Sequence, residues 1–277
     1  MKKKRGPKYY KSIVNNDVLN YDEYYMSFRE RLIYTTVIVG LGGLAGELFY
    51  GGWFKNNGTP TLLTHISNIV VFCVFGFLAL KVFYKRIVEK KRLKRQETLR
   101  GQFRDFLSSM STSLSSGANI YDSIRNSYDD LQGQYSENSY IVSEIYEILE
   151  GINNNVTVEK MFEEFGTRSG VDDIKNFAIV FATCNRRGGD IKKAVRRTYE
   201  IISEKIVIEE EIKTKVTSNK LQLNMMIVIP FVIVLMLKNS SSSFAESFAS
   251  VVGVIGLTIS AAIYLAAYLL GQKILKM

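Results

Sequence analysis

The chain has 277 residues, of which 47% are hydrophobic and 23% are charged, and its formal net charge is +9. Two cysteines are too few for a disulfide framework, and a single histidine leaves no Cys/His cluster for a structural metal site. The apolar residues are concentrated in a few long stretches, which indicates a protein partly buried in lipid rather than a water-soluble domain.

Residues 1–31 precede the first apolar stretch and form a basic N-terminal extension. They hold eight Lys and Arg, and polar, tyrosine-rich sequence (YYKSIVNNDVLNYDEYY) follows the charged start. No apolar run with a small-residue cleavage site is present there, so we do not expect a cleaved secretory signal. We expect a weakly structured cytoplasmic segment whose cations lie against anionic lipid head groups.

Four stretches are long, apolar and nearly free of charge: residues 32–50, 62–84, 221–237 and 248–270. At about 1.5 Å rise per residue, a helix of each length suits a hydrocarbon layer of roughly 30 Å, the third only just. The sequence therefore predicts four transmembrane helices in two hairpins, residues 32–84 and residues 221–277, the second with a short cytoplasmic tail.

The distribution of Lys and Arg predicts the orientation in the membrane. Residues 81–220 hold twenty-four, whereas the loops inside the two hairpins hold one each. The positive-inside rule then places both termini and residues 85–220 in the cytoplasm. Residues 81–104 carry a net charge of +8 and residues 105–220 a net charge of −5, so the basic excess adjoins the membrane. We expect membrane lipids as partners and no nucleic acid.

Residues 85–220 contain no proline and repeat apolar residues at helical spacing, for example Leu99, Phe103, Phe106 and Met110. A last run continues this pattern with Ile191, Val195 and Ile201. Glycines fall between the runs, at positions 117, 133, 151, 166, 188 and 189. This pattern predicts an all-α cytoplasmic bundle of about six helices, with breaks at the glycines. Two basic or charged helices, residues 81–104 and 190–220, are expected to continue into the apolar stretches as stalks.

Two short motifs predict corners between helices. GANIYDSI starts at Gly117 and GGDIKKAV at Gly188. In each, glycine suits the left-handed position that ends one helix, and Asn119 or Asp190 can cap the next. The spacing of 71 residues between them suggests two similar halves.

Arg186 and Arg187, just before the second corner, complement the dipole at a helix C-terminus, or they present a fork to a carboxylate on a partner. A phosphate-binding loop is excluded, because no Lys-Ser or Lys-Thr pair follows the glycines and no apolar strand precedes them.

Two residues inside the apolar stretches are candidate functional positions. Glu47 lies next to the sequence GLGGLAG. It is either an interfacial carboxylate beside a packed glycine face formed by Gly42 and Gly46, or an intramembrane charge with a function. Pro230 interrupts the third stretch, where it either shapes packing or provides a hinge.

The two glycine corners, the charged helix YEIISEKIVIEEEIKTKVTSNKLQ, the following span MMIVIPFVIV and a further span resemble the F-domain proteins of type II secretion and type IV pilus systems. The layout over residues 30–277 is most similar to tight-adherence (Tad/Flp) pilus platform proteins. Larger versions carry two F-domain copies, whereas this chain has one, and the N-terminal extension matches nothing in the resemblance.

The resemblance implies a platform in the bacterial inner membrane that couples a cytoplasmic secretion ATPase to the extraction and assembly of pilin subunits. It also implies a paralogous platform protein or a homo-oligomer as partner. Candidate contacts with the motor or another partner are Gly117, Asn119, Arg186, Arg187, Gly188, Gly189 and Asp190. The acidic run Glu209, Glu210 and Glu211 is a further candidate, or only a solvated helix face. Glu47 would then pair with the free amino terminus of a pilin.

Two other classes of function are less well supported by the sequence. An enzyme would need a base, a nucleophile or a metal, and the only histidine, His65, is expected at the non-cytoplasmic edge of the second span. We therefore predict no catalytic residue, no cofactor and no metal. A small-molecule transporter or channel subunit with a cytoplasmic regulatory bundle remains the alternative, with Glu47 as its one intramembrane charge.

Overall fold

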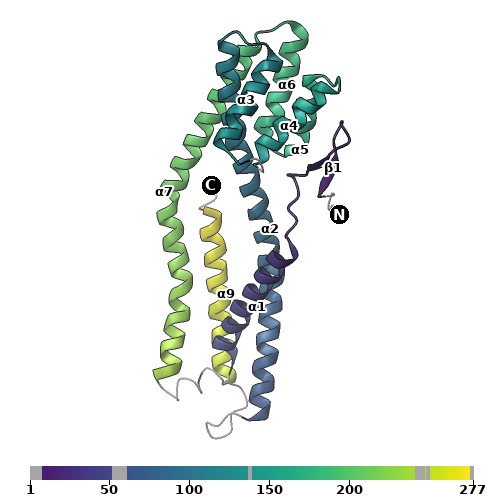
Figure 1. Ribbon diagram of the computed structural model, residues 1–277. Helices are drawn as coiled ribbons and strands as arrows, with labels where there is room; N and C mark the ends of the chain where they lie inside the picture. Colours follow the sequence, from purple (N-terminus) through teal and green to yellow (C-terminus); the bar gives the residue numbers. More distant parts are fainter. Residues whose placement is uncertain (1–7, 52–60, 137–138, 241–246, 248–249, 275–277) are drawn as a thin grey trace. The chain divides into compact units, whose positions relative to one another are not determined.

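The computed structural model describes residues 8–51, 61–136, 139–240, 247 and 250–274, and these are mostly helical. Its elements are the strands β1 (Tyr9–Lys11) and β2 (Asp17–Leu19) and the helices α1 (Phe28–Tyr50), α2 (Leu62–Ser115), α3 (Ile120–Gln134), α4 (Tyr140–Asn153), α5 (Val158–Ser169), α6 (Asp172–Arg187), α7 (Ile191–Ser240) and α9 (Val251–Ile274). Figure 1 shows these elements along the chain.

The chain divides into two compact units, which we name the bundle unit and the apolar unit. The bundle unit comprises Met1–Tyr25 and Val88–Glu210, and the apolar unit comprises Met26–Ile87 and Glu211–Met277. The long helices α2, with 54 residues, and α7, with 50 residues, belong to both units: one part of each helix lies in the bundle unit and the other part in the apolar unit.

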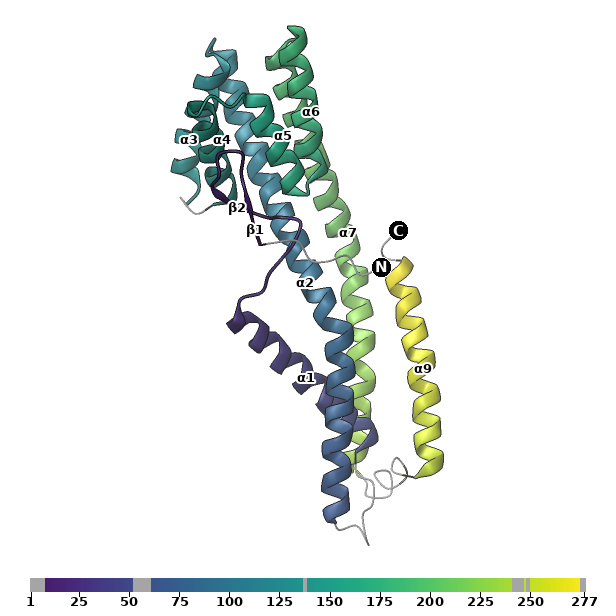
Figure 2. The same cartoon turned by 90° about the vertical axis from the view of Figure 1, so that its right-hand side faces the viewer.

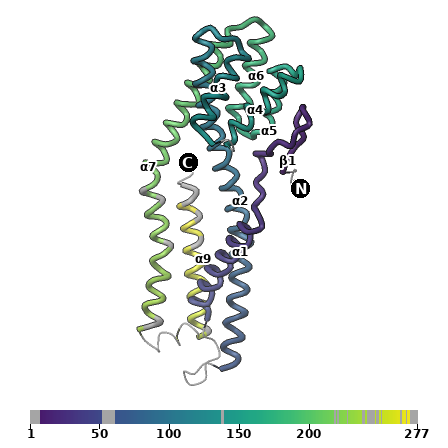
Figure 3. Tube along the Cα trace, viewed as in Figure 1, coloured from purple at the N-terminus to yellow at the C-terminus, as the bar shows by residue number. Residues whose placement is uncertain are grey.

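Within the bundle unit, α3 to α6 run up and down between the end of α2 and the start of α7 (Figure 3). Their facing sides bury a core in which six phenylalanines are at most 2% exposed: Phe103, Phe106, Phe162, Phe165, Phe177 and Phe181. The Phe162 and Phe181 rings lie 4.9 Å apart between α5 and α6, and Phe103 reaches Phe177 from α2 at 5.4 Å, both edge to face. Aromatic contacts with this geometry stabilise the core by more than the burial of their apolar surface alone.

The buried stripe of α7 differs from the sequence prediction at one position. Val195 and Ile202 are fully buried, whereas Ile201 is 38% exposed. Seven residues are close to two helical turns, so a stripe that contains Val195 continues at Ile202 and leaves Ile201 to one side.

The prediction that glycines separate the helices is correct at both corners and wrong at three positions, since Gly133, Gly151 and Gly166 lie inside helices. Gly166 is there because a Cβ would lie 3.0 Å from the Lys175 Cα, so it lets α5 and α6 approach closely. The actual end of α5 is Gly170, with a left-handed φ of +63°.

The N-terminal extension also differs from expectation, because residues 9–19 form an antiparallel hairpin instead of a weakly structured segment. Tyr9 pairs with Leu19, and Tyr10 with Val18. Val14 and Leu19 of the hairpin segment pack against the bundle core, and Tyr21, just after it, is a core residue that is 1% exposed, so the unit is not purely helical.

The apolar unit holds α1, α9 and the apolar parts of α2 and α7. By length and composition α1, α2 and α7 could each cross a membrane. The apolar stretch described in α9, Val252–Tyr268, is shorter, so the predicted fourth crossing stays a prediction. The loops expected at residues 51–61 and 238–247, including the Lys55 position, lie largely outside the described residues.

Candidate functional site

The first predicted corner has the expected caps. Gly117 adopts a φ of +93° after α2 ends. Asn119 caps α3, since its Oδ1 accepts a hydrogen bond of 2.8 Å from the Asp122 N–H. Both residues are exposed, so their side of the corner is available for contact.

The second corner repeats the arrangement at the start of α7. Gly188 ends α6 with a φ of +67°, and the Gly189 N–H donates to the Cys184 carbonyl at 2.7 Å. Asp190 caps α7, because its Oδ1 accepts from the Lys193 N–H at 2.9 Å. Figures 1 and 2 show both corners at the same end of the bundle unit, which we name the turn end.

A third turn at this end was predicted at Gly151 but lies after Asn153, in a segment that contains no glycine. Asn155 adopts a left-handed φ of +62° between α4 and α5. Asparagine tolerates that conformation better than most residues, so the run of three asparagines from Asn153 was the available signal. Tyr121 of α3 donates to Asn153 Oδ1 at 3.3 Å, which connects this turn to the first corner.

The exposed side chains of the second corner are predominantly basic. Six exposed cations, here called the basic corner, occupy the last turn of α6 and the first two turns of α7: Arg186, Arg187, Lys192, Lys193, Arg196 and Arg197. Glu200 offsets part of this charge by pairing with Arg196 at 3.2 Å and Arg197 at 3.5 Å. Ile191 is only partly exposed and Val195 is buried, so the corner presents charge and little apolar surface.

The acidic candidates are in part already engaged within the bundle. Glu209 of α7 accepts hydrogen bonds from both terminal nitrogens of Arg100 of α2, one of them 2.8 Å long. The hydrogen bond from Arg100 lowers the pKa of Glu209, although partial burial opposes the change. Asp173 pairs with Lys205 and lies 4.0 Å from Arg100. Glu209 therefore joins α7 to α2, and its carboxylate already has a partner.

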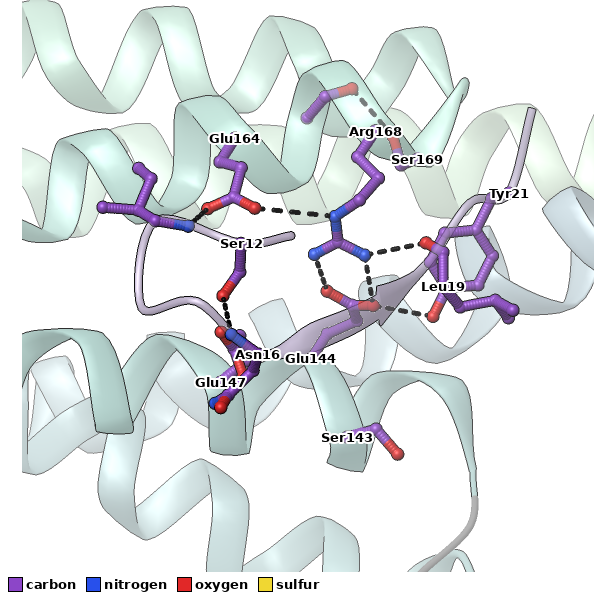
Figure 4. Close-up of polar contacts among 12 residues, drawn as sticks. Ser12, Asn16, Leu19, Tyr21, Ser143, Glu144, Glu147, Glu164, Arg168 and Ser169 are labelled. Atoms are coloured by element: carbon purple, nitrogen blue, oxygen red, sulfur yellow. Dashed lines mark hydrogen bonds and ion pairs between the residues drawn. The ribbon is translucent and has the colours of Figure 1, made fainter. Parts of the chain in front are cut away.

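A buried polar cluster joins the N-terminal hairpin to α4 and α5 (Figure 4). Arg168 of α5 donates two hydrogen bonds to Glu144 of α4, at 2.8 and 2.6 Å, and one to the Leu19 carbonyl at 3.0 Å. The Tyr21 hydroxyl donates to the same carboxylate at 2.8 Å. Sequence reasoning missed this cluster, because charged residues in a helical pattern are expected on its solvated face.

Two members of the cluster, Tyr21 and Arg168, keep the protons with which they donate hydrogen bonds. Burial raises the pKa of the Tyr21 phenol well above its usual value, and the nearby Glu144 charge raises it further. Burial by itself would lower the pKa of Arg168, but its hydrogen bonds to Glu144 and the nearby charges of Glu144 and Glu164 together outweigh that effect, and the net change is upward. Tyr21 and Arg168 are thus both donors at neutral pH.

A hollow of about 530 Å³ lies between the hairpin and α5. Its lining includes three cations and three carboxylates: Lys11, Lys160, Arg168, Asp22, Glu163 and Glu164. Positive and negative side chains are equal in number, so the lining favours neither an anionic nor a cationic ligand.

The two intramembrane candidates lie in the apolar unit. Glu47 is half-buried, and Asn68 of α2 lies 3.5 Å away as a hydrogen-bond donor. The neighbouring glycines pack tightly, since a Cβ on Gly42 would lie 2.5 Å from Ala79 Cβ. The glycine face beside Glu47 is thus packed, and whether Glu47 is an interfacial carboxylate or an intramembrane charge with a function stays a prediction.

Pro230 lies inside α7, which continues on both sides of it. Proline lacks an N–H, so the Met226 carbonyl four residues earlier has no helical donor. The Tyr264 hydroxyl of α9 donates to that carbonyl instead. The proline thus creates an acceptor that a neighbouring apolar helix satisfies.

Residues 106–237 match the family model described as type II secretion system (T2SS), protein F. The matched segment begins in α2, contains both glycine corners and ends in the apolar part of α7. No curated protein and no solved structure matches the chain.

The family match indicates a role in a secretion or pilus platform in general, and together with the apolar helices it indicates a membrane protein. Among the residues that the structure describes, no group of three or more His, Cys, Asp or Glu is placed to hold a metal ion.

Proposed function

We propose that the chain is an inner-membrane assembly platform of a Tad-like type IV pilus or a type II secretion machine. In this proposal both termini and the bundle unit lie in the cytoplasm. A cytoplasmic ATPase moves the bundle, and that motion extracts pilin subunits from the bilayer and adds them to a growing filament. The platform contains this chain together with a paralogous protein or further copies of itself.

The observation that carries the proposal is the family match over residues 106–237. It covers α3 to α6 completely and continues along α7 into an apolar stretch. Because α2 and α7 are each one helix from an apolar stretch to a corner of the turn end, they are suited to carry a displacement. An uninterrupted hydrogen-bonded helix transmits motion better than a loop with few packed contacts.

We assign the motor contact to the turn end, and more specifically to the basic corner. Six exposed cations there favour an acidic surface on the ATPase, and steering by such charges speeds association. The contact predicted from Glu209 is less favourable, because that carboxylate already pairs with Arg100. In this assignment the chain contributes the positive charges and the ATPase the negative ones, which is the reverse of the arrangement expected from the acidic run.

Within the membrane we propose two further roles. Glu47 accepts the amino terminus of a pilin, with Asn68 as its partner when no pilin is bound. Pro230 is the hinge at which motion of α7 enters the bilayer, because the missing backbone hydrogen bond makes bending there less costly.

The test is co-purification of the secretion ATPase with the tagged full chain from native membranes. Arg186→Glu combined with Arg187→Glu should abolish recovery of the ATPase. Lys192→Glu combined with Lys193→Glu should do the same, and these acids lie in the first turn of α7, where the helix dipole favours them, so we expect this variant to stay folded. The matched control reverses Arg125 and Lys175, two exposed cations on α3 and α6.

Undiminished ATPase recovery with both corner variants would remove the assignment of the contact. Solute flux through liposomes that contain the purified chain alone would instead favour the transporter alternative and count against a platform.

A further inference from the structure

The N-terminal hairpin is attached to α4 and α5 by polar contacts along most of its length. The Ile13 N–H donates to Glu164 at 3.2 Å. Asn16 Nδ2 donates to Glu147 and to Glu150, each at 2.9 Å. Beyond these, Leu19 and Tyr21 join the buried pair of Glu144 and Arg168 (Figure 4). The acceptors belong to three successive turns of α4 and to α5, so the hairpin follows both helices.

This kind of attachment fixes a position more than it adds stability. Glu144 and Arg168 have side chains that are 4% and 5% exposed. A buried ion pair of this sort usually gains little over well-packed apolar residues, but any shift that separates the partners is costly. A hairpin that also satisfies Tyr21 and the Leu19 carbonyl therefore has one strongly preferred placement on the bundle.

The residues that follow the hairpin are held as well, on the basic part of α2. Arg92 donates to Asp22 Oδ1 at 2.7 Å. The Arg95 guanidinium lies 4.5 Å from the centre of the Tyr24 ring, a cation–π contact. Helix α1 begins at Phe28, where Ser27 and Glu30 form a capping box.

Only residues 25–27 lie between Tyr24 and α1. At no more than about 3.6 Å per residue, the four steps from Tyr24 to Phe28 reach at most about 15 Å. The start of α1 cannot move further than this from Tyr24, whatever the rest of the chain does.

We propose that residues 8–24 are a tether through which the bundle unit controls the start of α1, so that displacement of α4 and α5 pulls on the first apolar helix. This rests on the proposed platform function, to which it adds a third mechanical connection besides α2 and α7. Residues 8–24 lie outside the segment that matches the family model, so the tether is a property of this chain's own N-terminal segment.

The first experiment tests the attachment, with hydrogen exchange on the full chain in lipid nanodiscs. Tyr21→Phe removes one hydroxyl from the buried cluster, and Tyr10→Phe removes one from a hairpin tyrosine that is 39% exposed. The amides of Ser12 and Asn20, which donate within the hairpin, should exchange faster in Tyr21→Phe than in Tyr10→Phe. Equal exchange in the two variants would show that the cluster does not hold the hairpin.

The second experiment tests the coupling in cells by adding slack. Gly/Ser segments of 4, 8 and 12 residues are inserted between Tyr25 and Met26, and the control carries the same segments after Met1, where they add mass without slack. With equal amounts of protein in the membrane, filament number or secreted protein should fall stepwise with the length of the slack insertion, and the control should match the wild type.

The outcomes separate the tether from the proposed function. If slack insertions and controls both restore full output to a deletion strain, the tether is wrong and the platform stands. If the wild-type chain itself makes no difference to output, the platform proposal fails first.

Discussion

Glu144 and Arg168 form the most deeply buried ion pair among the described residues. Glu144→Gln keeps the shape of the side chain but removes the closer counter-charge of the buried Arg168, which then has only Glu164, 3.8 Å from its Nε. Removing one partner from a buried pair typically costs about 3–5 kcal/mol. We predict a marked loss of stability of the bundle unit, measured by thermal unfolding of the full chain in detergent and by hydrogen exchange in α4 and α5.

The matched control for that substitution is Glu200→Gln in the exposed pairs with Arg196 and Arg197. Exposed pairs contribute about 1 kcal/mol or less, so this variant should unfold close to the wild-type temperature. A Glu144→Gln protein as stable as Glu200→Gln would contradict the role assigned to the buried cluster.

Two glycines inside helices should respond to alanine in opposite directions. At Gly166 a Cβ would lie 3.0 Å from the Lys175 backbone, so Gly166→Ala should separate α5 from α6 and cost about 1–3 kcal/mol. At Gly133 of α3 nothing lies within 4 Å, and alanine should gain up to about 1 kcal/mol from helix propensity. Unfolding temperatures of the two variants that move in the same direction would refute this assignment.

At the residue scale, sequence patterns predicted what depends on local chemistry. The caps at Asn119 and Asp190 and the left-handed glycines before them follow from neighbouring residues alone, and the structure confirms them. The Glu144–Arg168 pair joins residues 24 positions apart and is completed by Leu19 and Tyr21. No local pattern encodes such a contact, so it could not be predicted.

At the scale of elements, the Arg100–Glu209 pair that connects α2 to α7 should depend on pH. The pKa of Glu209 is lowered in the folded chain, chiefly by the hydrogen bond from Arg100. The stabilisation is therefore present above the ordinary glutamate value of 4.5 and is lost as the pH falls through the lower folded value. Asp173, Lys205 and Glu97 are the other charges that act on this pair.

We predict that Glu209→Gln lowers the unfolding temperature at pH 6 and that this difference from the wild type shrinks as the pH approaches 3. Thermal unfolding at several pH values measures the effect. A difference that stays constant over this range would show that the pair makes no pH-dependent contribution.

The hydrogen bond from Tyr264 of α9 to the carbonyl freed by Pro230 predicts a coupling between two substitutions. Tyr264→Phe should weaken the contact of α7 with α9 in the wild-type chain, by about 0.6 and at most 1.7 kcal/mol. In Pro230→Ala the new N–H can satisfy the Met226 carbonyl, and Tyr264→Phe should then have little effect. A double-mutant cycle on unfolding in detergent measures the coupling, and purely additive effects would contradict the contact.

Prediction of whole elements succeeded where one periodic face is buried. The runs in α2, α3 and α4 gave the correct core residues, since Phe103, Ile124 and Ile145 are fully buried. The hairpin was not predicted, because its strands have three residues each, and the buried Val18 with Tyr21 just after it shows no repeating pattern. Such short strands are specified by the surface they pack on.

At the scale of the whole molecule, the net charge of a segment did not predict the charge of the surface that we propose contacts the ATPase. Residues 105–220 sum to −5, yet the exposed corner between α6 and α7 is basic. Part of the acidic total is buried or paired, as in Glu144, Asp173 and Glu209. Composition gives the total charge of the segment, whereas a partner protein contacts only the charged side chains that the fold leaves exposed.

The membrane arrangement remains a prediction at this scale. Among the residues that the structure describes, three helices satisfy length and composition for a crossing, and the cytoplasmic position of the bundle unit is predicted from the Lys and Arg distribution. A cysteine introduced at Arg187, in a chain without Cys73 and Cys184, should react with a membrane-impermeant maleimide only after cells are opened. Labelling of intact cells would reverse the orientation.

As a platform, the chain is required for filament assembly or protein secretion, and a deletion strain tests this requirement most directly. Surface filaments are counted by electron microscopy and exported protein is measured by immunoblot, in the deletion strain and after complementation with the wild-type chain. We predict that output disappears on deletion and returns with the wild-type chain. A deletion strain that assembles and secretes at the wild-type level would contradict the account.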